Sequence, residues 1–301
     1  MDQLSAMRAF VRVVEAGTFT RAAMTLGMPK PTVTKLVQNL ESHVRTKLLH
    51  RTTRRVSVTP DGAAYYERVV RVLSDIDELD GSMTSSQSRP SGRLRVDVSS
   101  TLAVLILIPA LSTFHERYPE IQIDLGVSDR PVDLIGENVD CVLRAGELTD
   151  QSLIARRIGA LRFITCAAPS YLQSHGMPQH PNELGGTHHI VSYFHARSGR
   201  PIPMTFVRGD EKYEIFGRYI VSVNDGNAYV AAGLAGLGVL QGPSFMIEPH
   251  LESGTLRRVL PDWQSTTLPL HVVFPPNRHI GNRVRVFVDW VVELLAAQKI
   301  S

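Results

Sequence analysis

Apolar positions in the first 60 residues recur at helical spacing in three short segments. The first segment runs from Leu4 to Gly17, and the second starts at Thr18, whose hydroxyl suits a helix N-cap. Gly27 ends the second segment, because glycine adopts the left-handed C-cap conformation at least cost. A third helix follows a proline-flanked turn, with an inward stripe at Val33, Leu36, Val37 and Leu40. Residues 48–51 and 55–58 then predict two short paired strands.

The outer face of the third predicted helix is small, polar and basic. Short hydroxyls and lysines suit phosphates and base edges, and two helices with a tight turn followed by a strand pair resemble a winged helix-turn-helix. A helical hairpin with an ordinary solvated face has the same spacing. The candidate DNA-binding residues are Thr18, Arg21, Lys30, Pro31, Thr32, Thr34, Lys35, Gln38, Arg51, Arg54 and Arg55.

Charge separates this basic segment from the rest of the chain. Residues 1–62 hold ten Lys and Arg against four Asp and Glu, a net charge of +6. The whole 301-residue chain carries +3, so the remainder carries −3. A basic module at one end of a mildly acidic chain fits a polyanionic partner. From the interrupted apolar runs we expect no signal peptide and no membrane-spanning helix.

A long helix is predicted over residues 61–88, and a polar, Ser-rich hinge is predicted over residues 82–92. Such a helix packs either on a copy of itself or on its own body. Its apolar positions near heptad spacing are Tyr65, Tyr66, Val69, Val72, Leu73, Ile76, Leu79 and Met83. We expect domain boundaries at 1–60, 61–91 and 92–301.

From Gly92 onward, predicted strands alternate with helices. Strands at 93–98, 121–127 and 139–144, with an apolar helix between the first two, indicate a doubly wound α/β sheet. A second lobe over about 163–267 interrupts a first lobe of about 92–162 and 268–301. Ligands of such sheets bind beyond the carboxyl ends of the strands, so we expect a site between the lobes.

Hydroxyl and amide groups gather where the predicted strands end. Ser99, Ser100 and Thr101 stand at a strand-to-helix junction, where free backbone N–H groups suit a carboxylate or another anion, and Arg144 adds a cation. The same three residues can merely cap a helix, and Arg144 can pair with a surface acid. The candidate ligand-binding residues are Ser99, Ser100, Thr101, Ser128, Arg144, Gly146, Val223, Asn224, Gln241 and Pro243.

Histidines and cysteines add no metal or catalytic motif. His188, His189 and His195, with His175 and His180 upstream, lack carboxylate or cysteine partners at ligand spacing, so we expect neither a metal nor a cofactor. Cys141 and Cys166 lie in apolar strands and are interpreted as buried structural thiols, with a redox role left open.

The N-terminal third resembles LysR-type transcriptional regulators. The matching segments are 10–17, 18–23, 26–27, 31–34, 40–41, 48–55 and 59–62. One departure is Arg45, which stands where the family usually has glycine after the recognition helix, so we expect an altered turn or one more phosphate contact. The resemblance implies a linker helix that dimerises and a two-lobed, periplasmic-binding-protein-like effector domain.

We therefore interpret the chain as an α/β regulator with an N-terminal winged helix-turn-helix, cytoplasmic and without enzymatic activity. The partners that this interpretation implies are double-stranded DNA with an interrupted palindrome, a small-molecule effector such as a carboxylate, further copies of the chain in a dimer or tetramer, and RNA polymerase, but no membrane. Two alternatives are a sensor module that acts through a protein partner and an α/β enzyme with a basic appendage.

Overall fold

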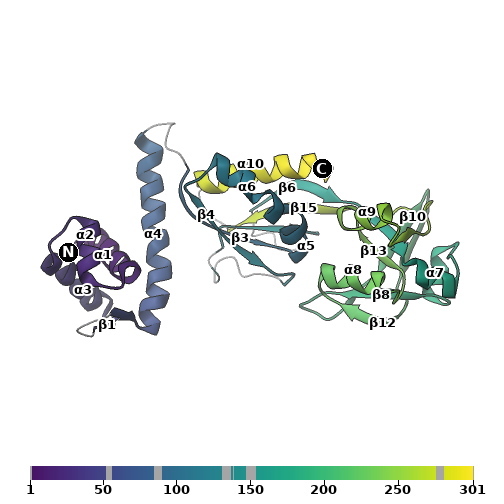
Figure 1. Cartoon of the computed structure of the whole chain (residues 1–301), viewed down its shortest axis with the longest axis horizontal. Coiled ribbons are helices and arrows are strands. Elements are labelled where there is room, and N and C mark those ends of the chain that lie inside the picture. Colours follow the sequence, from purple (N-terminus) through teal and green to yellow (C-terminus); the bar gives the residue numbers. More distant parts are fainter. Residues whose placement is uncertain are drawn as a thin grey trace. The chain divides into compact units, whose positions relative to one another are not determined.

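The computed structural model describes residues 2–51, 56–84, 90–130, 137, 139–146, 154–275 and 281–300. The chain divides into two compact units, Met1–Ser88 and Arg89–Ser301, which are described separately below (Figure 1).

Unit 1 consists of helices around one small core and a two-stranded wing. Its elements are α1 (Gln3–Ala16), α2 (Phe19–Leu26), α3 (Lys30–Val44), β1 (Leu49–Arg51), β2 (Val56–Val58) and α4 (Pro60–Thr84). The core is formed by residues at the inward positions that the sequence predicted, among them Phe10, Val33, Val37 and Leu40, each fully buried. β1 and β2 pair antiparallel, as the alternation predicted.

The long helix α4 begins on this core. Thr59 caps it, since the Thr59 hydroxyl accepts the N–H of Gly62 at 2.9 Å. Val69 and Leu73 are buried in the unit 1 core, and the Tyr65 ring lies edge-on to Phe10 with centroids 5.7 Å apart. The part of the apolar stripe nearest the wing therefore packs on its own unit rather than on a second copy. Val72 is 46% exposed, and the side chains of Leu79 and Met83 lie outside the described residues.

Lobe I of unit 2 is a five-stranded sheet with two covering helices. Its elements are β3 (Gly92–Val98), α5 (Ser100–Leu102), the π-helical turn η1 (Ala103–Leu107), α6 (Ile108–Arg117), β4 (Ile121–Val127), β5 (Cys141–Ala145), β6 (Ile154–Leu161), β15 (Leu268–Phe274) and α10 (Asn282–Ala297). The strand order is β4-β3-β5-β15-β6. α6 and α10 pack together through Phe114 and Trp290, whose ring centroids lie 5.1 Å apart.

The lobe I sheet is mixed, because the chain crosses between the lobes twice. β3 pairs parallel with β4 and with β5, as a doubly wound sheet requires. β15 pairs antiparallel with both β5 and β6. β6 runs toward lobe II and β15 returns from it, and the sequence pattern did not predict β6.

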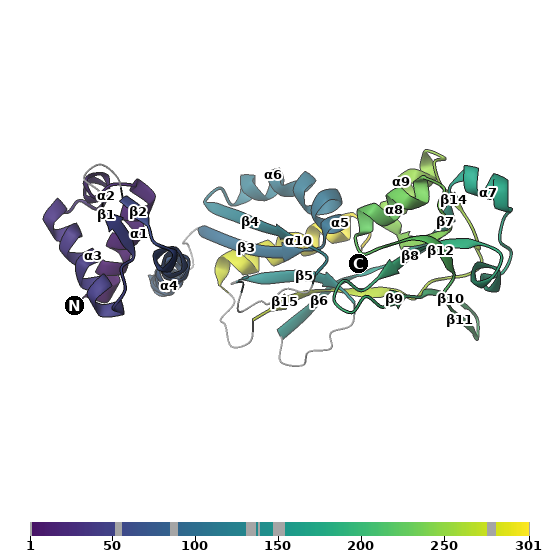
Figure 2. The same ribbon diagram turned by 90° about the horizontal axis from the view of Figure 1, so that it is seen from below.

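Lobe II has its own core and three small sheets. Its elements are β7 (Phe163–Ala167), α7 (Pro169–His175), the 3-10 helix η2 (Pro181–Gly185), β8 (His189–Phe194), β9 (Pro201–Ile202), β10 (Met204–Arg208), β11 (Glu211–Ile215), β12 (Arg218–Val223), α8 (Gly226–Leu234), β13 (Leu240–Pro243), α9 (Ser244–Glu252) and β14 (Arg257–Arg258). The sheet orders are β12-β8-β9, β13-β7-β14 and β10-β11. α5 of lobe I and α8 of lobe II lie side by side in both views (Figures 1 and 2).

Candidate functional site

The turn between α2 and α3 is built by local caps. Thr18 accepts the N–H of Arg21 on its hydroxyl at 3.2 Å, so this hydroxyl is engaged in capping α2. Gly27 takes the left-handed conformation with φ 61° and ends α2. Pro29 is the N-cap of α3 and Pro31 lies in its first turn, where a missing N–H costs nothing. These caps fix the angle at which α3 leaves the turn.

The outer face of α3 is exposed as predicted. Lys30, Pro31, Thr32, Lys35 and Gln38 are all exposed. In the described part of the chain, neither lysine forms an ion pair or a side-chain hydrogen bond. The basic groups of this face are therefore available to an anionic partner.

The other predicted DNA contacts differ in availability. Arg21 on α2 is exposed and has no side-chain partner among the described residues. Thr34 is half-buried, and its hydroxyl donates to the Lys30 carbonyl at 2.9 Å, so its donor is spent within α3. Arg51 lies in β1 opposite Val56. Arg54, Arg55 and the side chain of Arg51 lie outside the described residues.

Arg45 ends α3 in the conformation that glycine would adopt. Its φ is 54° and its N–H bonds to the Glu41 carbonyl. The expected alteration of this turn is therefore wrong: the turn keeps a left-handed C-cap, and the arginine bears the strain. The Arg45 side chain is exposed beside the end of α3, so the second expectation, a phosphate contact, stays a prediction.

Glu41 is a buried residue. The sequence pattern predicted no role for it beyond its place in the matching segment 40–41. It is 3% exposed, and its carboxylate accepts the N–H groups of Leu48 and Leu49 at 3.0 and 3.2 Å. The carboxylate thus ties the end of α3 to the start of the wing. A negatively charged residue within the apolar stripe of α3 was the only sequence signal for this role.

In unit 2, the predicted strand-to-helix junction lies where the two lobes meet. Ser100 donates its N–H to Asp129 of lobe I at 3.0 Å and its hydroxyl to Asp225 of lobe II at 2.5 Å. Asn227 of α8 donates to the same hydroxyl oxygen at 3.4 Å. Asn224 accepts the Tyr193 hydroxyl on its backbone carbonyl at 3.2 Å. The structure therefore brings Ser100 and the residues around Asn224 together across the lobes.

The other predicted residues differ in how close they come to this junction. Thr101, the second residue of α5, lies there beside Gly226, and Ser99 is the N-cap of α5 and makes no side-chain cap bond. Ser128 accepts the N–H of Arg130 on its hydroxyl at 3.0 Å. Gly146 has φ 118° and donates its N–H to Pro269 at 2.9 Å. Val223 ends β12 half-buried.

Arg144 is bound by a buried acid. Its guanidinium donates to the Asp97 carboxylate and, at 3.1 Å, to the Arg130 carbonyl. Burial raises the pKa of Asp97 above its usual value, while the attraction of Arg144 acts in the opposite direction. Because Asp97 is 7% exposed, the arginine balances an internal charge rather than standing free for a ligand.

The Gln241 side chain is hydrogen-bonded within lobe II. Its side-chain oxygen accepts the Thr205 N–H at 3.0 Å, and its amide nitrogen donates to the Thr165 hydroxyl and the Thr205 carbonyl, both at 3.0 Å. These bonds hold β10 to β13 inside lobe II, and a part for Gln241 in ligand binding stays a prediction. Pro243 ends β13 opposite Phe163, where the chain enters lobe II.

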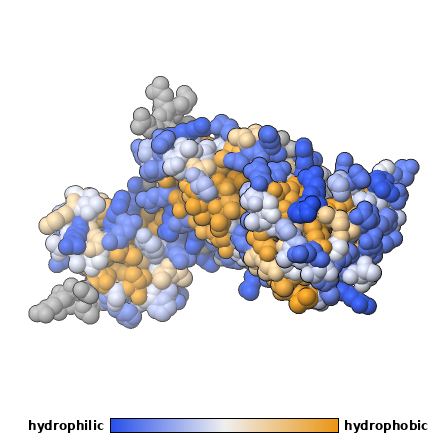
Figure 3. All heavy atoms as spheres, turned by 45° about the vertical axis from the view of Figure 1, so that its right-hand side comes forward, coloured by the Kyte–Doolittle hydropathy of each residue, from blue (hydrophilic) through white to orange (hydrophobic). Residues whose placement is uncertain are grey.

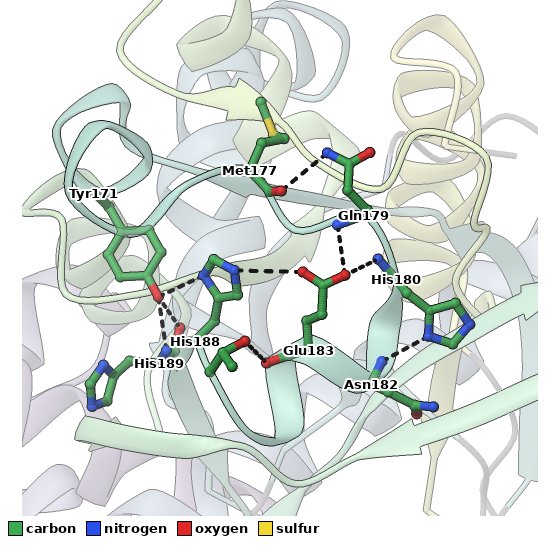
Figure 4. Close-up of polar contacts among 9 residues, drawn as sticks. Tyr171, Met177, Gln179, His180, Asn182, Glu183, His188 and His189 are labelled. Carbon is green, nitrogen blue, oxygen red and sulfur yellow. Dashed lines mark hydrogen bonds and ion pairs between the residues drawn. The ribbon is translucent and has the colours of Figure 1, made fainter.

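His180, His188 and His189 belong to a polar network with Tyr171 and Glu183 inside lobe II (Figure 4). Tyr171 contacts Nδ1 of His188 at 3.3 Å through its hydroxyl, and Nε2 of His188 lies 4.0 Å from Glu183, a carboxylate neighbour that sequence spacing missed. Burial lowers the pKa of His188, which is 4% exposed. Among the described residues, no group of three or more His, Cys, Asp or Glu side chains is placed to hold a metal ion.

Both cysteines are buried in strands of different lobes, Cys141 in β5 and Cys166 in β7. Burial raises the pKa of the Cys166 thiol to about 12 and also raises that of Cys141. Thiols in such surroundings are protonated and unreactive at neutral pH.

Family models match both parts of the chain. The model of the bacterial regulatory helix-turn-helix protein, lysR family, matches residues 4–63, and the LysR substrate binding domain matches residues 87–296.

Whole-chain relatives agree with these matches. The chain is 40% identical to an HTH-type transcriptional repressor of Pseudomonas aeruginosa over 98% of this chain and 93% of the relative. It is similar to the structure of CrgA, a LysR-type transcriptional regulator from Neisseria meningitidis, with TM-score 0.60, 33% identity and coverage of 96% and 97%. The full-length Vibrio cholerae virulence activator AphB gives TM-score 0.59, 30% identity and coverage of 96% and 98%. On this evidence the chain belongs to the LysR family of bacterial transcriptional regulators.

Proposed function

We propose that this LysR-family regulator binds operator DNA through α3 and the β1–β2 wing, and that a small molecule bound between the two lobes of unit 2 changes that binding. The division into a DNA reader (1–60), a linker helix with hinge (61–91) and an effector domain (92–301) belongs to the same proposal. The chain then acts as a cytoplasmic binding protein and not as an enzyme.

The proposed binding to operator DNA rests on the outer face of α3. Lys30 and Lys35 are exposed, and neither is neutralised by an acid among the described residues. Arg21 presents a third unpaired cation on the neighbouring helix. Unpaired cations beside an exposed helix face support phosphate contacts that position the helix in a major groove.

The effector half rests on the junction at Ser100. A helix start lies at the carboxyl end of β3, and groups from both lobes converge on one residue there. A ligand held at such a point touches both lobes and so biases their arrangement. Within the described chain, no helix is long and apolar enough to cross a lipid bilayer.

Self-association is supported by exposed apolar surface. β12 is an edge strand, and on it Tyr219 and Ile220 are 56% and 67% exposed, with Phe216 beside it at 60%. Figure 3 shows apolar surface gathered in patches on one face of the molecule. Exposed apolar side chains at a sheet edge are typical of an interface.

A mobility-shift assay with the DNA upstream of the protein's own gene tests the DNA half. We expect binding that falls about 10³-fold or more between 50 and 200 mM salt if six or more phosphates are contacted. A library of small aromatic and aliphatic acids, screened by thermal shift on the full chain, tests the effector half, since a ligand of the folded state raises Tm by mass action. Salt-independent or absent DNA binding contradicts the proposal.

A further inference from the structure

Ser100 is the residue at which the two lobes of unit 2 share hydrogen bonds. Its hydroxyl lies 2.5 Å from the Asp225 carboxylate of lobe II, the shorter contact, and 3.2 Å from the Asp129 carboxylate of lobe I, while its N–H donates to Asp129 at 3.0 Å. The Asn227 amide donates to the Ser100 hydroxyl oxygen at 3.4 Å. A serine has two donors, N–H and O–H, and both are given to carboxylates of the protein itself.

Asp225 is held rigidly in this contact. It is the N-cap of α8, and its second carboxylate oxygen accepts the Ala228 N–H at 2.8 Å. One carboxylate therefore bridges the first turn of α8 and the first residue of α5, across the lobe boundary. Because the cap fixes the side chain, the bond to Ser100 breaks only when the lobes move relative to each other or the cap is lost.

A close backbone approach accompanies the polar contact. Gly226 follows Asp225, and a Cβ placed on Gly226 would overlap the Cγ2 atom of Thr101. The backbone of Gly226 has no positive φ, so the glycine is needed for the space beside Thr101 and not for its conformation. Ser100 and Thr101 are thus the two points at which α5 meets the start of α8.

The surroundings of the contact are negatively charged. Burial, with the nearby Asp129 and Asp225 carboxylates acting in the same direction, raises the pKa of Tyr193 to about 12. Arg144, a cation of the lobe I sheet, is bound to Asp97. The N–H and O–H groups of Ser100 suit a carboxylate from solution, but both are already bound to carboxylates of the protein.

We propose that Asp225 is a built-in occupant of the effector site, whose carboxylate holds the Ser100 hydroxyl until the carboxylate of an effector replaces it. The inference rests on the proposed function, because it assigns the effector to the same junction. Exchange of one carboxylate for another keeps the bonds of Ser100 and releases the clasp of Ser100, Thr101, Asp225 and Gly226. The release of this clasp is how effector binding changes the arrangement of the lobes.

Two variants open the clasp in different ways. Gly226→Ala inserts a methyl group against Thr101 and leaves every hydrogen bond donor in place. Ser100→Ala removes the hydroxyl that any carboxylate would use. Thr101→Ser, combined with Gly226→Ala, removes the overlapping methyl and restores the fit. Gly185→Ala and Ser174→Ala are matched controls in lobe II, since a Cβ on Gly185 meets no atom within 4 Å and Ser174 is exposed.

The arrangement of the lobes is measured on the full chain. The readout is the distance between spin labels at Ser112→Cys in α6 and Gln173→Cys in α7. Both natural cysteines are buried, so labelling is confined to these exposed sites. We expect Gly226→Ala and Ser100→Ala to broaden or shift the distance, because each weakens the contact between Ser100 and Asp225 across the lobes. Gly226→Ala with Thr101→Ser returns the distance to the wild-type value.

Benzoate serves as the carboxylate probe, with benzamide as the uncharged control. Gly226→Ala is expected to bind benzoate about tenfold more tightly than wild type, whereas Ser100→Ala opens equally and binds it no better. The clasp is overturned if the spin-label distance in Gly226→Ala is unchanged. It is also overturned if Gly226→Ala and wild type bind benzoate with equal affinity. These readouts need no DNA, so loss of DNA binding in wild type would refute the proposed function and leave the clasp to be judged by them alone.

Discussion

Glu41 accepts the backbone N–H of Leu48 at 3.0 Å, across the turn that joins the recognition helix to the wing. The same oxygen accepts the Leu49 N–H at 3.2 Å, and the carboxylate is 3% exposed. Lys47 reaches the other oxygen at 3.4 Å but is itself 79% exposed, so it contributes little. One carboxylate thus accepts the N–H groups of two buried residues.

Glu41→Ala is therefore expected to destabilise unit 1 by about 2–4 kcal/mol, because two buried N–H groups lose a charged acceptor. Glu41→Gln keeps a carbonyl oxygen in place and is expected to cost less. Urea unfolding of the full chain followed by circular dichroism measures both, and Glu67→Ala on the exposed face of α4 is the control. Equal stability of Glu41→Ala and Glu67→Ala would show that water replaces the carboxylate.

The contrast between Thr18 and Glu41 shows what the sequence could predict. Thr18 caps a helix three residues away, and Gly27 ends it locally, so a short window contains both the residue and its partner. Glu41 bonds to residues seven and eight positions ahead, and Ser100 bonds to a residue 125 positions ahead. No local pattern encodes such pairs, because only the packed fold brings them together.

The same reasoning explains why some strands were predicted and β6 was not. β3, β4 and β5 are apolar on alternate positions or throughout and were predicted, whereas β6 begins with four exposed residues, including Arg156 and Arg157. Its pairing with β15 is set by the return of the chain from lobe II. The bonds of Gln241 could not be predicted for a related reason: its partners Thr205 and Thr165 lie 36 and 76 positions away in the sequence, and only the folded lobe brings them together.

Arg45→Gly is expected to stabilise unit 1 by about 0.5–1 kcal/mol. Arg45 holds φ 54°, a conformation that costs an L-residue energy but costs glycine almost none. Part of the gain is lost to the larger entropy of glycine in the unfolded chain. Urea unfolding compares Arg45→Gly with Arg45→Ala, which removes the same side chain and keeps the strain. A glycine variant no more stable than the alanine variant would contradict the strain.

Lys35→Ala should weaken operator binding and lower the salt dependence of log K by about one unit if the lysine neutralises one phosphate. Lys35 is exposed on α3 and unpaired among the described residues, so its removal leaves the fold intact. Mobility shifts at several salt concentrations give the slope. Arg197→Ala, an exposed cation of lobe II, is the matched control. An unchanged slope for Lys35→Ala places the phosphates on another face.

Thr32→Ala and Arg21→Ala separate base reading from phosphate contact. Thr32 is exposed at the start of α3, and its hydroxyl is not spent within the helix, in contrast to the hydroxyl of Thr34. Thr32→Ala is expected to reduce the preference for the operator over a scrambled duplex by about 1–3 kcal/mol, whereas Arg21→Ala weakens both duplexes alike. Competition binding with the two duplexes measures the difference. If the Thr32 change weakens both equally, Thr32 does not read a base.

His188 links the stability of lobe II to pH. Burial lowers its pKa below the ordinary 6.5, the neighbouring His175 and His189 act in the same direction, and Glu183 acts against them (Figure 4). The folded state therefore holds His188 neutral, with Nδ1 facing the Tyr171 hydroxyl at 3.3 Å. Below pH 6.5 the unfolded chain binds a proton that the folded chain does not, so this contribution is complete above pH 6.5 and is lost as pH falls.

We expect His188→Gln to flatten the fall of the free energy of unfolding below pH 6.5, by at most about 1.4 kcal/mol per pH unit for one proton. Urea unfolding followed by Trp263 and Trp290 fluorescence at pH 5.0 to 7.5 gives the slope. His115→Gln, an exposed histidine of α6, is the control and should keep the wild-type slope. The slope decides the test and the absolute stability does not, because glutamine at a buried position lowers stability at every pH. Parallel curves for wild type and His188→Gln would mean that His188 does not supply the pH dependence.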